Sequence, residues 1–467
     1  MIYYVIKKEL QEIFRDGRFK ISISIVFVLL IVALLATNKQ YKTTNYQYNE
    51  AKNNERTIWE SQGEKTPHSA AHYGNYIFKP KSPLSLIDQG IDKYTGVSVF
   101  LEAHSRNQAQ FSNASDQTAL SRFGELTVDF ILLYILPLII ILIGYNSFTK
   151  EIEGKTIYIL KSQGVTGWKL LLGKWVATLI PLFTILTFLF ATGAIILSSI
   201  ENYGVFNWKP FGTLYLIYLL YYFVFINITL IISSLVKKSG ISLVINLSFW
   251  VLACFITPKV ASNLADAKYP YPTHQEFSKQ ISEENKKGLD GHNPWSKEAK
   301  KLEQEVLTKY KVDSVHKLPF NFSAYRMQKG EEYQAKVYQK HYAFLKEQAK
   351  NQDKIYKSLA IISPFLPTRF LSMAVAKTDY ENHWNFTESA EIYRVETQGF
   401  LNGTTQKNSK YGERYVAPAS TWSKLPEFKY ETSSFEKTLQ QNSFLFLMLF
   451  VWFIITSLVL TFTNKTY

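Results

Sequence analysis

Residues 21–37 read ISISIVFVLLIVALLAT, an unbroken apolar run that decides the class of this fold. A helix needs about 20 mostly apolar residues to cross the hydrocarbon core of a bilayer. The run holds no charged side chain, and a basic segment of the chain precedes it. No small-x-small cleavage site follows cleanly, so an uncleaved helix fits better than a signal peptide. We therefore predict a first transmembrane helix here.

Five further apolar runs occur along the chain, and each predicts another spanning helix. The six predicted spans are residues 21–37, 126–148, 170–199, 211–236, 241–257 and 443–463. Pro137 is expected to kink the second span, a distortion that neighbouring helices accommodate in membranes. Asn246 is expected to face other helices rather than lipid. The pattern predicts a mainly α, multi-pass protein with a six-helix membrane domain.

The composition of the whole chain hides this pattern. Mean hydropathy is -0.07 and 47% of the residues are apolar, averages that also fit a soluble protein. The formal net charge is +14, which in a soluble protein suggests nucleic acid. Much of the excess lies beside the predicted spans, so we expect a lipid membrane as partner and no nucleic acid.

Lysine and arginine residues near the span ends predict the orientation of the helices. The cytoplasmic side is expected to carry Lys7, Lys8, Arg15, Arg18, Lys20, Lys150, Lys155, Lys161, Lys169, Lys237, Lys238 and Lys465. The short loop 200–210 on the other side holds only Lys209 as a positive charge. Both termini are therefore predicted to be cytoplasmic, and segments 38–125 and 258–442 extracytoplasmic.

The segments outside the spans differ in character. Residues 1–20 are expected to form an amphipathic helix in the membrane interface. Segment 38–125 starts with polar residues at helical spacing, so the first spanning helix is expected to continue outward. In the larger outer segment we predict mostly helix, including residues 295–310 and 330–359. Residues 393–430 contain clusters of Gly, Asn, Thr and Pro and are expected to form loops with some strand.

The loop 149–169, TKEIEGKTIYILKSQGVTGWK, is the only predicted cytoplasmic loop with room for structure. It begins with the acids Glu151 and Glu153, continues through Thr156 to an apolar turn, and breaks at Gly164. The residues alone leave two interpretations open. One is a short amphipathic helix that transmits the motion of a cytoplasmic protein, and the other is a solvated connector with charges at its ends.

The pattern Glu151-x-Glu153-x-x-Thr156, with Gly173-Lys174 at the start of the next helix, resembles ABC-2 type permeases of bacteria. In that family an acid-rich segment after the second span forms a coupling helix, which sits in a cleft of the ATPase subunit. One position departs from the family pattern, because Lys155 stands where a glycine precedes the threonine. The resemblance implies ATPase-coupling roles for Glu151, Glu153, Thr156, Gly164, Gly173 and Lys174.

The same resemblance implies a set of partners and a location. An ABC ATPase subunit would bind ATP and Mg²⁺, so this chain would bind no cofactor directly. A second permease subunit, identical or paralogous, would complete the complex. The location implied is the bacterial cytoplasmic (inner) membrane.

Segment 258–442 resembles the large domain between the fifth and sixth spans in one subfamily of these permeases. The matching residues are Tyr271–Phe277, Leu318–Phe322, Gln328, Gly330, Glu331, Ser363, Pro364, Thr378, Asp379, His383, Phe386, Ala390, Glu391, Tyr393 and Arg394. The candidates for an extracytoplasmic polar site among them are Asn321, Asp379, His383, Glu391 and Arg394. Residues of these types more often serve as structural hydrogen-bond partners.

Several kinds of chemistry lack their sequence signatures. The nearest match to a P-loop, Gly167–Lys174, has the wrong spacing, and Trp175 stands where Ser or Thr must bind magnesium. No metalloprotease or serine-hydrolase motif occurs, and no pair of the eight histidines has a strong ligand spacing. We therefore predict no catalytic residue, no metal site and no enzyme activity, so ATP hydrolysis requires a separate subunit.

The predicted function is that of the permease subunit of an ATP-driven exporter with an unidentified cargo. The alternative, from another class, is a mechanotransmitter or envelope-assembly anchor that transports nothing. It would move its outer domain against a periplasmic or envelope protein. The outer segments favour this alternative because they are larger than a conduit requires. A membrane-tethered ectoenzyme using Asp379, His383 and Glu391 is a third hypothesis, and the missing motifs argue against it.

Overall fold

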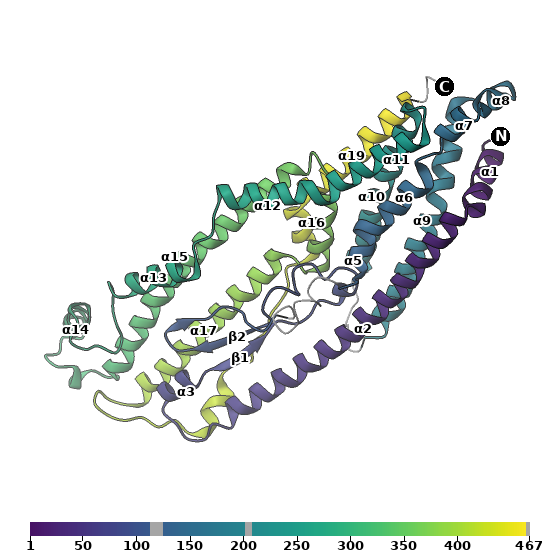
Figure 1. Cartoon of the computed structure of the whole chain (residues 1–467). Coiled ribbons are helices and arrows are strands. Elements are labelled where there is room, and N and C mark those ends of the chain that lie inside the picture. Colours follow the sequence, from purple (N-terminus) through teal and green to yellow (C-terminus); the bar gives the residue numbers. More distant parts are fainter. Residues whose placement is uncertain (113–124, 201–207, 464–467) are drawn as a thin grey trace.

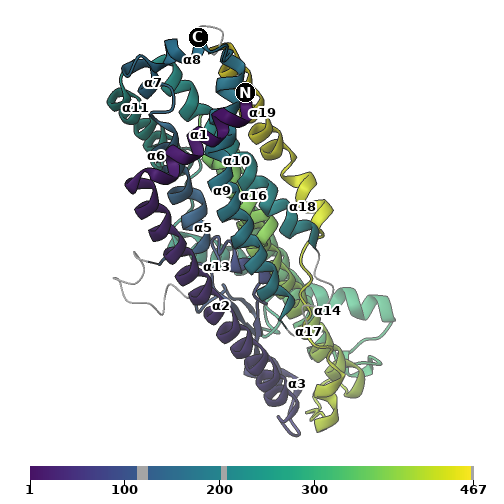
Figure 2. The ribbon, with the colours of Figure 1, turned by 90° about the vertical axis from the view of Figure 1, so that its right-hand side faces the viewer.

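The computed structural model describes residues 1–112, 125–200 and 208–463. Six of the described helices are long and apolar enough to cross a membrane, which confirms the predicted number of spans. They form a bundle at one end of an elongated molecule, and a mostly helical domain lies at the other end (Figure 1; Figure 2). We call this second part the distal domain, and it comprises the described residues of 38–125 and 258–442.

Each span is one helix or a run of helices joined end to end. The helices that build the spans are α2 (Gly17–Glu60), α5 (Val128–Phe130), η2 (Ile131–Ile135), α6 (Leu136–Gly144), α7 (Thr149–Glu153), α9 (Gly167–Ser198), α10 (Trp208–Leu235), α11 (Ser239–Val251), η3 (Leu252–Ile256), α12 (Thr257–Lys268) and α19 (Ser443–Thr463). The last span coincides with its prediction, whereas the first reaches Glu60 and the fifth reaches Lys268. The first helix thus continues outward, as its polar continuation predicts. Lys465 and most of the predicted loop 200–210 lie outside the described residues.

Two short helices complete the bundle at the end that lies away from the distal domain. They are α1 (Ile2–Arg15) and α8 (Thr156–Ser162), and α7 lies beside them (Figure 1). We call this the terminal end of the bundle, because the N-terminus and the last described turn of α19 also lie there.

Two prolines distort their spans through π-helical turns. The turn η2 directly precedes the turn that holds Pro137, and η3 precedes the turn that holds Pro258. A proline has no N–H and leaves carbonyls of the preceding turn without a partner. Tyr221 and Tyr222 of α10 supply donors, since their hydroxyls bond the carbonyls of Leu133 and Leu132 at 3.0 and 3.1 Å. Neighbouring side chains therefore replace the backbone bonds that the second span loses.

Buried polar side chains join the spanning helices. Asn227 on α10 accepts a hydrogen bond from Trp175 Nε1 at 2.8 Å and donates to Thr456 and Ser457 of α19 at 3.1 and 2.9 Å. Asn246 is buried among helices, which confirms that it does not face lipid. Interhelical hydrogen bonds of this kind hold membrane helices together where lipid supplies no partner.

Helix α16 (Phe365–Ala376) is a feature that the hydropathy pattern does not predict. Its twelve residues are too few to span a bilayer, yet it is almost wholly buried against α10 and α19. Ser372 bonds the Tyr218 hydroxyl at 2.7 Å, and Arg369 pairs with Asp129 at 2.7 Å and with Asp88 at 3.2 Å. Helix α16 thereby anchors the distal domain to the bundle.

The distal domain is layered around two long helices, α15 (Phe322–Leu359) and α17 (Tyr380–Asn408). Its other elements are α3 (Pro67–Tyr73), β1 (Asn75–Phe78), η1 (Pro83–Leu86), β2 (Ser98–Glu102), β3 (Ser105–Arg106), α13 (His274–Asn285), α14 (Lys297–Tyr310), η4 (Val315–Lys317), η5 (Ala419–Lys424) and α18 (Phe435–Gln441). The strands form one antiparallel sheet of order β1-β2-β3. Helix α12 packs along α15, whereas α2 runs on the opposite side, beyond α17 and the sheet (Figure 1).

The predicted helices of this domain are only partly right. Helices α14 and α15 confirm the predictions for 295–310 and 330–359, but the prediction of loops and strand for 393–430 is wrong as far as Asn408. Helix α17 continues through Gly399 and Gly403 because its inner face is buried, with Leu401 packed beside Trp422. Burial of that face outweighs the poor helix propensity of glycine and threonine.

Candidate functional sites

Charged side chains from three helices meet at the terminal end of the bundle. Helices α1, α7 and α9 contribute them, and we call the set the terminal ion network: Lys8, Glu9, Glu12, Lys150, Glu151 and Lys174. Lys174 Nζ lies 2.7 Å from Glu9 and 3.5 Å from Glu151. Lys150 reaches Glu9 at 3.0 Å, and Lys8 pairs with Glu151. Three lysines and three glutamates thus balance one another.

The centre of this network is buried. Glu9, Glu151 and Lys174 are almost fully buried, a costly position for any charge without a partner. Burial alone raises the pKa of Glu9, but Lys174, Lys150 and Lys8 together lower it to about 2. The carboxylate therefore stays ionised at neutral pH. Because each buried charge contacts an opposite one, the network fixes α7 against α1 and α9.

The residues that the resemblance assigns to coupling are only partly brought together. Thr156 donates a hydrogen bond to the Glu151 carboxylate, and a Cβ on Gly173 would lie 2.5 Å from Val5 of α1. Glu153 instead accepts bonds from the Ser239 N–H at 2.9 Å and hydroxyl at 2.7 Å, which ties α7 to the start of α11. Gly164 adopts φ +78° in the turn after α8. Lys150 of the same loop, with Lys8, Glu9 and Glu12 of α1, completes the network, and the three residues of α1 could not be predicted from the loop alone.

Helix α8 presents an apolar surface beyond the bundle. Ile157 is buried beneath it, whereas Tyr158 and Ile159 are 69% and 56% exposed. Lys155, in the left-handed conformation at φ 57°, turns the chain between α7 and α8. Trp168, at the start of α9, is also exposed. Tyr158 and Ile159 thus make the tip of the α7–α8 hairpin apolar and exposed, and such surface marks a contact with a protein or a membrane.

The five candidate residues of the distal domain do not form one polar site. Asn321 caps α15 by accepting the Ser323 N–H at 2.9 Å, and Asp379 caps α17 by accepting the Asn382 N–H at 3.2 Å. Burial raises the pKa of Asp379 to about 6 and lowers that of His383 to about 4. Both side chains lie in the first turn of α17. Asn321 and Asp379 are therefore structural helix caps.

Glu391 and Arg394 belong to a different cluster, one turn apart on α17. Arg394 Nε lies 2.8 Å from Glu391, and its Nη1 lies 3.4 Å from Glu331 of α15. Glu331 in turn contacts Nδ1 of His104, in the turn between β2 and β3. We call Arg394, Glu391, Glu331 and His104 the distal ion network. It connects the sheet to both long helices.

Four histidines gather around His104, which is also a member of the distal ion network. His68, His72, His104 and His292 offer ligand nitrogens that all lie within 4.8 Å of one another, so they form a group able to hold a metal ion. The expectation of no metal site rested on sequence spacing alone, and the structure brings together four histidines that this spacing does not connect. The overlooked signal is His68-x-x-x-His72, since residues four apart share one face of a helix. His104 and His292 come from other segments and gave no signal.

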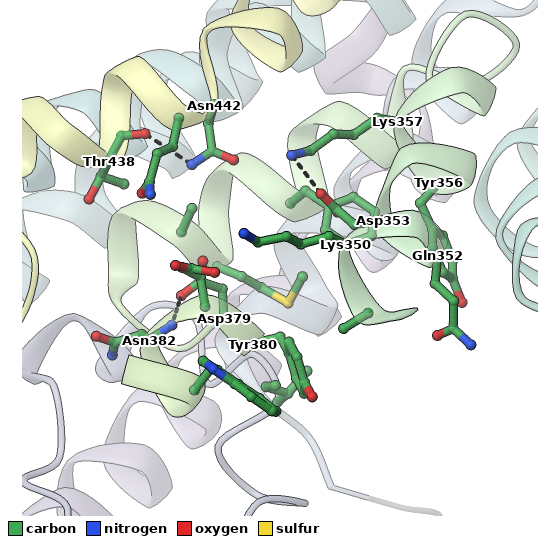
Figure 3. Close-up of a pocket in the computed structure, with 18 of the residues that line it drawn as sticks. Lys350, Gln352, Asp353, Tyr356, Lys357, Asp379, Tyr380, Asn382, Thr438 and Asn442 are labelled. Atoms are coloured by element: carbon green, nitrogen blue, oxygen red, sulfur yellow. Dashed lines mark hydrogen bonds and ion pairs between the residues drawn. The ribbon is translucent and has the colours of Figure 1, made fainter. Parts of the chain in front are cut away.

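A cavity of about 540 Å³ lies between α15, α16, α17 and α18. The side chains of Lys350, Asp353, Lys357, Asp379 and Tyr380 line it, and Figure 3 shows the Asp353–Lys357 pair on α15 and Asn442 before α19. Its apolar lining residues include Phe370, Met373 and Trp384. The cavity therefore combines lysines with an apolar wall, next to the point where α16 enters the bundle.

These features define the chain as a mainly α, multi-pass membrane protein with a large domain beyond its spans. Within that domain, residues 274–431 match the model of a family described as a domain of unknown function, DUF3526. The matched segment runs from α13 past η5 and so includes Glu331, Glu391 and Arg394 of the distal ion network. No curated protein matches the chain.

Proposed function

We propose that this chain is the permease subunit of an ATP-driven exporter in the bacterial cytoplasmic membrane. Both termini would be cytoplasmic, and the distal domain would lie on the extracytoplasmic side of the membrane. A separate ABC ATPase subunit would bind ATP and Mg²⁺, and a second permease subunit, identical or paralogous, would complete the transport path. The chain itself would not be an enzyme.

The observation that carries this proposal is the α7–α8 hairpin. Its tip exposes Tyr158 and Ile159, and its base is tied to α1 and α9 through the buried Glu151. A protein that pushes on α8 would therefore act on α7, and the ion pairs of Glu151 would pass the motion to α1 and α9. The arrangement supports a role for Glu151 in holding α7 against α1 and α9. It also supports the exposed tip of the hairpin as the contact with an ATPase.

The cavity beside α16 supports transport of an amphiphilic molecule. Its charged lining residues are Lys346, Lys350, Lys357, Lys377, Asp353, Asp379 and Glu381, and they lie beside the apolar Phe370 and Met373. A lining of mixed charge next to an apolar wall suits a molecule with a polar headgroup and an apolar body. The cavity also lies where the distal domain meets the bundle, which is where a cargo leaving the membrane would pass.

Site-specific photo-crosslinking in native membranes tests the ATPase contact. A photoreactive amino acid at Ile159 should form an adduct with a protein that binds a radiolabelled ATP analogue. The matched control is the same probe at Trp295, which is 79% exposed but lies in the distal domain. An ATP-binding adduct at Trp295 and none at Ile159 would contradict both the contact and the orientation.

A second function, mechanotransmission, is favoured by the continuity of α2. With 44 residues this helix is about 65 Å long, roughly twice the thickness of a bilayer core. Its outer end is locked into the distal domain, because Trp59 Nε1 donates to the Trp422 carbonyl at 3.1 Å. Motion at the terminal end would therefore reach the distal domain through one continuous helix, α2.

Removal of residues 270–350 distinguishes the two functions. A conduit for cargo should keep measurable export, because all six spans and α16 remain. A machine that acts through its outer domain should lose its cellular effect while the ATPase contact at Ile159 persists. Loss of the Ile159 crosslink in the shortened chain would mean that the deletion has disrupted the bundle, and the crosslink therefore serves as the internal control.

A further inference from the structure

Four of the eight histidines of the distal domain lie in contact with one another, unlike ordinary surface histidines. His68 and His72 lie one turn apart on α3, with their Nε2 atoms 3.2 Å apart. The rings of His104 and His292 lie 4.5 Å apart, and those of His72 and His104 lie 5.1 Å apart. Three separate segments thus bring four imidazoles to one point.

The spacing of these rings suits a tetrahedral metal ion. Zinc–nitrogen bonds of about 2.0–2.1 Å place tetrahedral ligand atoms roughly 3.4 Å apart. The 3.2 Å separation of His68 and His72 is close to this value, and the group as a whole lies within 4.8 Å. Small side-chain rotations would bring all four nitrogens to bonding distance.

The backbone around the group is arranged to hold these side chains in place. His104 adopts the left-handed conformation at φ 66°, which few residues other than glycine occupy. The loop of His292 lies directly on α15, since a Cβ on Gly330 would meet Gly291 N at 2.7 Å. Thr66 caps α3 by accepting the Ser69 N–H at 3.2 Å. Strained and close-packed backbone of this kind clusters at functional sites.

The distal ion network supplies the outer partner that a metal-bound histidine needs. Glu331 contacts Nδ1 of His104, which leaves Nε2 for another ligand. That Nε2 is buried and has no hydrogen-bond partner among the described residues. A carboxylate on the far nitrogen orients a histidine and strengthens its bond to a metal. Since buried polar atoms are rarely left without a partner, the Nε2 atom of His104 is available to bind a ligand.

The charges around the group favour a cation. Arg394 is the one positive group in the distal ion network and faces two carboxylates, Glu331 and Glu391, so the network carries one net negative charge.

We propose that His68, His72, His104 and His292 form a binding site for one divalent transition-metal ion of the Zn²⁺ type. Imidazole nitrogens select Zn, Cu, Ni or Co over Mg and Ca. Four histidines fill a tetrahedral shell and leave no position for a substrate, so the site is structural. The ion joins α3 and the β2–β3 turn to the loop before α14, and thereby fastens the two distal segments to each other. This site does not depend on the proposed transport function.

Metal binding to the full chain tests the proposal. The protein is purified in detergent through a tag without histidines, stripped with a chelator and titrated with Zn²⁺. We expect one Zn²⁺ per chain by elemental analysis, a rise in melting temperature, and the visible absorption of a tetrahedral ion when Co²⁺ replaces Zn²⁺. Absence of a stoichiometric ion, or an octahedral Co²⁺ spectrum, would overturn the proposal.

Single variants assign the ligands. His72→Ala and His104→Ala should each weaken Zn²⁺ binding more than the roughly 10- to 100-fold that loss of an outer carboxylate costs. Glu331→Gln should weaken it within that range. The matched control is His316→Ala, an exposed histidine elsewhere in the domain, which should bind Zn²⁺ like the wild type. Because His72 is exposed, its variant decides the matter even if His104→Ala misfolds; unchanged affinity in His72→Ala would overturn the assignment.

Discussion

The two buried ion networks differ in whether they are complete. In the terminal ion network three lysines and three glutamates pair among themselves, and its central residues Glu9, Glu151 and Lys174 each contact an opposite charge. The distal ion network has one arginine for two glutamates, and it ends on His104, whose Nε2 is left without a partner among the described residues. A closed network fixes helices to one another, whereas an open one leaves a position for a ligand.

The difference follows from what each network joins. The terminal network connects three helices that already pack closely, with Gly173 and Val5 in contact between α9 and α1. The distal network connects the β2–β3 turn of segment 38–125 to two long helices of segment 258–442. At the terminal network, balanced charges and close helix packing are sufficient to hold the helices together. At the distal network, an additional cross-link between the two segments is useful. Force transmission and metal binding are therefore expected at opposite ends of the molecule.

Lys174→Met should lower the stability of the chain more than the other variants, because it removes a buried charge from the closed terminal ion network. The substitution leaves Glu9 and Glu151 buried next to each other with one fewer positive charge. Breaking a buried ion pair by removing one partner costs about 3–5 kcal/mol. We expect a clear fall in the melting temperature of the detergent-solubilised chain, measured by differential scanning fluorimetry, and faster proteolysis of the α7–α8 hairpin.

Lys150→Met is the matched control for this prediction. Lys150 belongs to the same network and has the same charge, but its side chain is partly exposed to solvent. Water can then replace part of the lost pairing, and the loss of stability should be markedly smaller. Equal losses for the two variants would show that burial does not set the strength of this network.

The membrane part of the fold could be predicted from the sequence because the signal is local. A run such as 21–37 or 443–463 identifies a span without knowledge of any other residue. Helix α16 escaped prediction because twelve residues with Arg369 among them read as part of a soluble domain. Only its packing against α10 and α19 shows that it belongs with the bundle.

The candidate sites were harder to predict because they join residues far apart in the chain. Glu151 could be singled out from its loop, but Lys8 and Glu9 lie more than a hundred residues earlier. The histidine group needs a helix, a strand turn and a loop to meet, and only the pair on α3 has a recognisable spacing. Long-range pairing of this kind follows from tertiary packing, which a single sequence does not display.

Acid should weaken the terminal ion network through Glu9. Its pKa falls from an ordinary value of 4.5 to about 2, because Lys174, Lys150 and Lys8 outweigh the opposing effect of burial. Above pH 4.5 the carboxylate is ionised in both the folded and the unfolded chain, so its stabilising contribution is complete and constant. Between pH 4.5 and 2 the unfolded chain takes up the proton first, and the contribution is lost as the pH falls.

The melting temperature of Glu9→Gln should lie below that of the wild type at pH 7, and the two should converge as the pH approaches 3. Other carboxylates titrate in both proteins, so the difference between the two curves isolates Glu9. Parallel curves from pH 7 to 3 would show that Glu9 has the same pKa in the folded and the unfolded chain, which would contradict the lowering of its pKa by the three lysines.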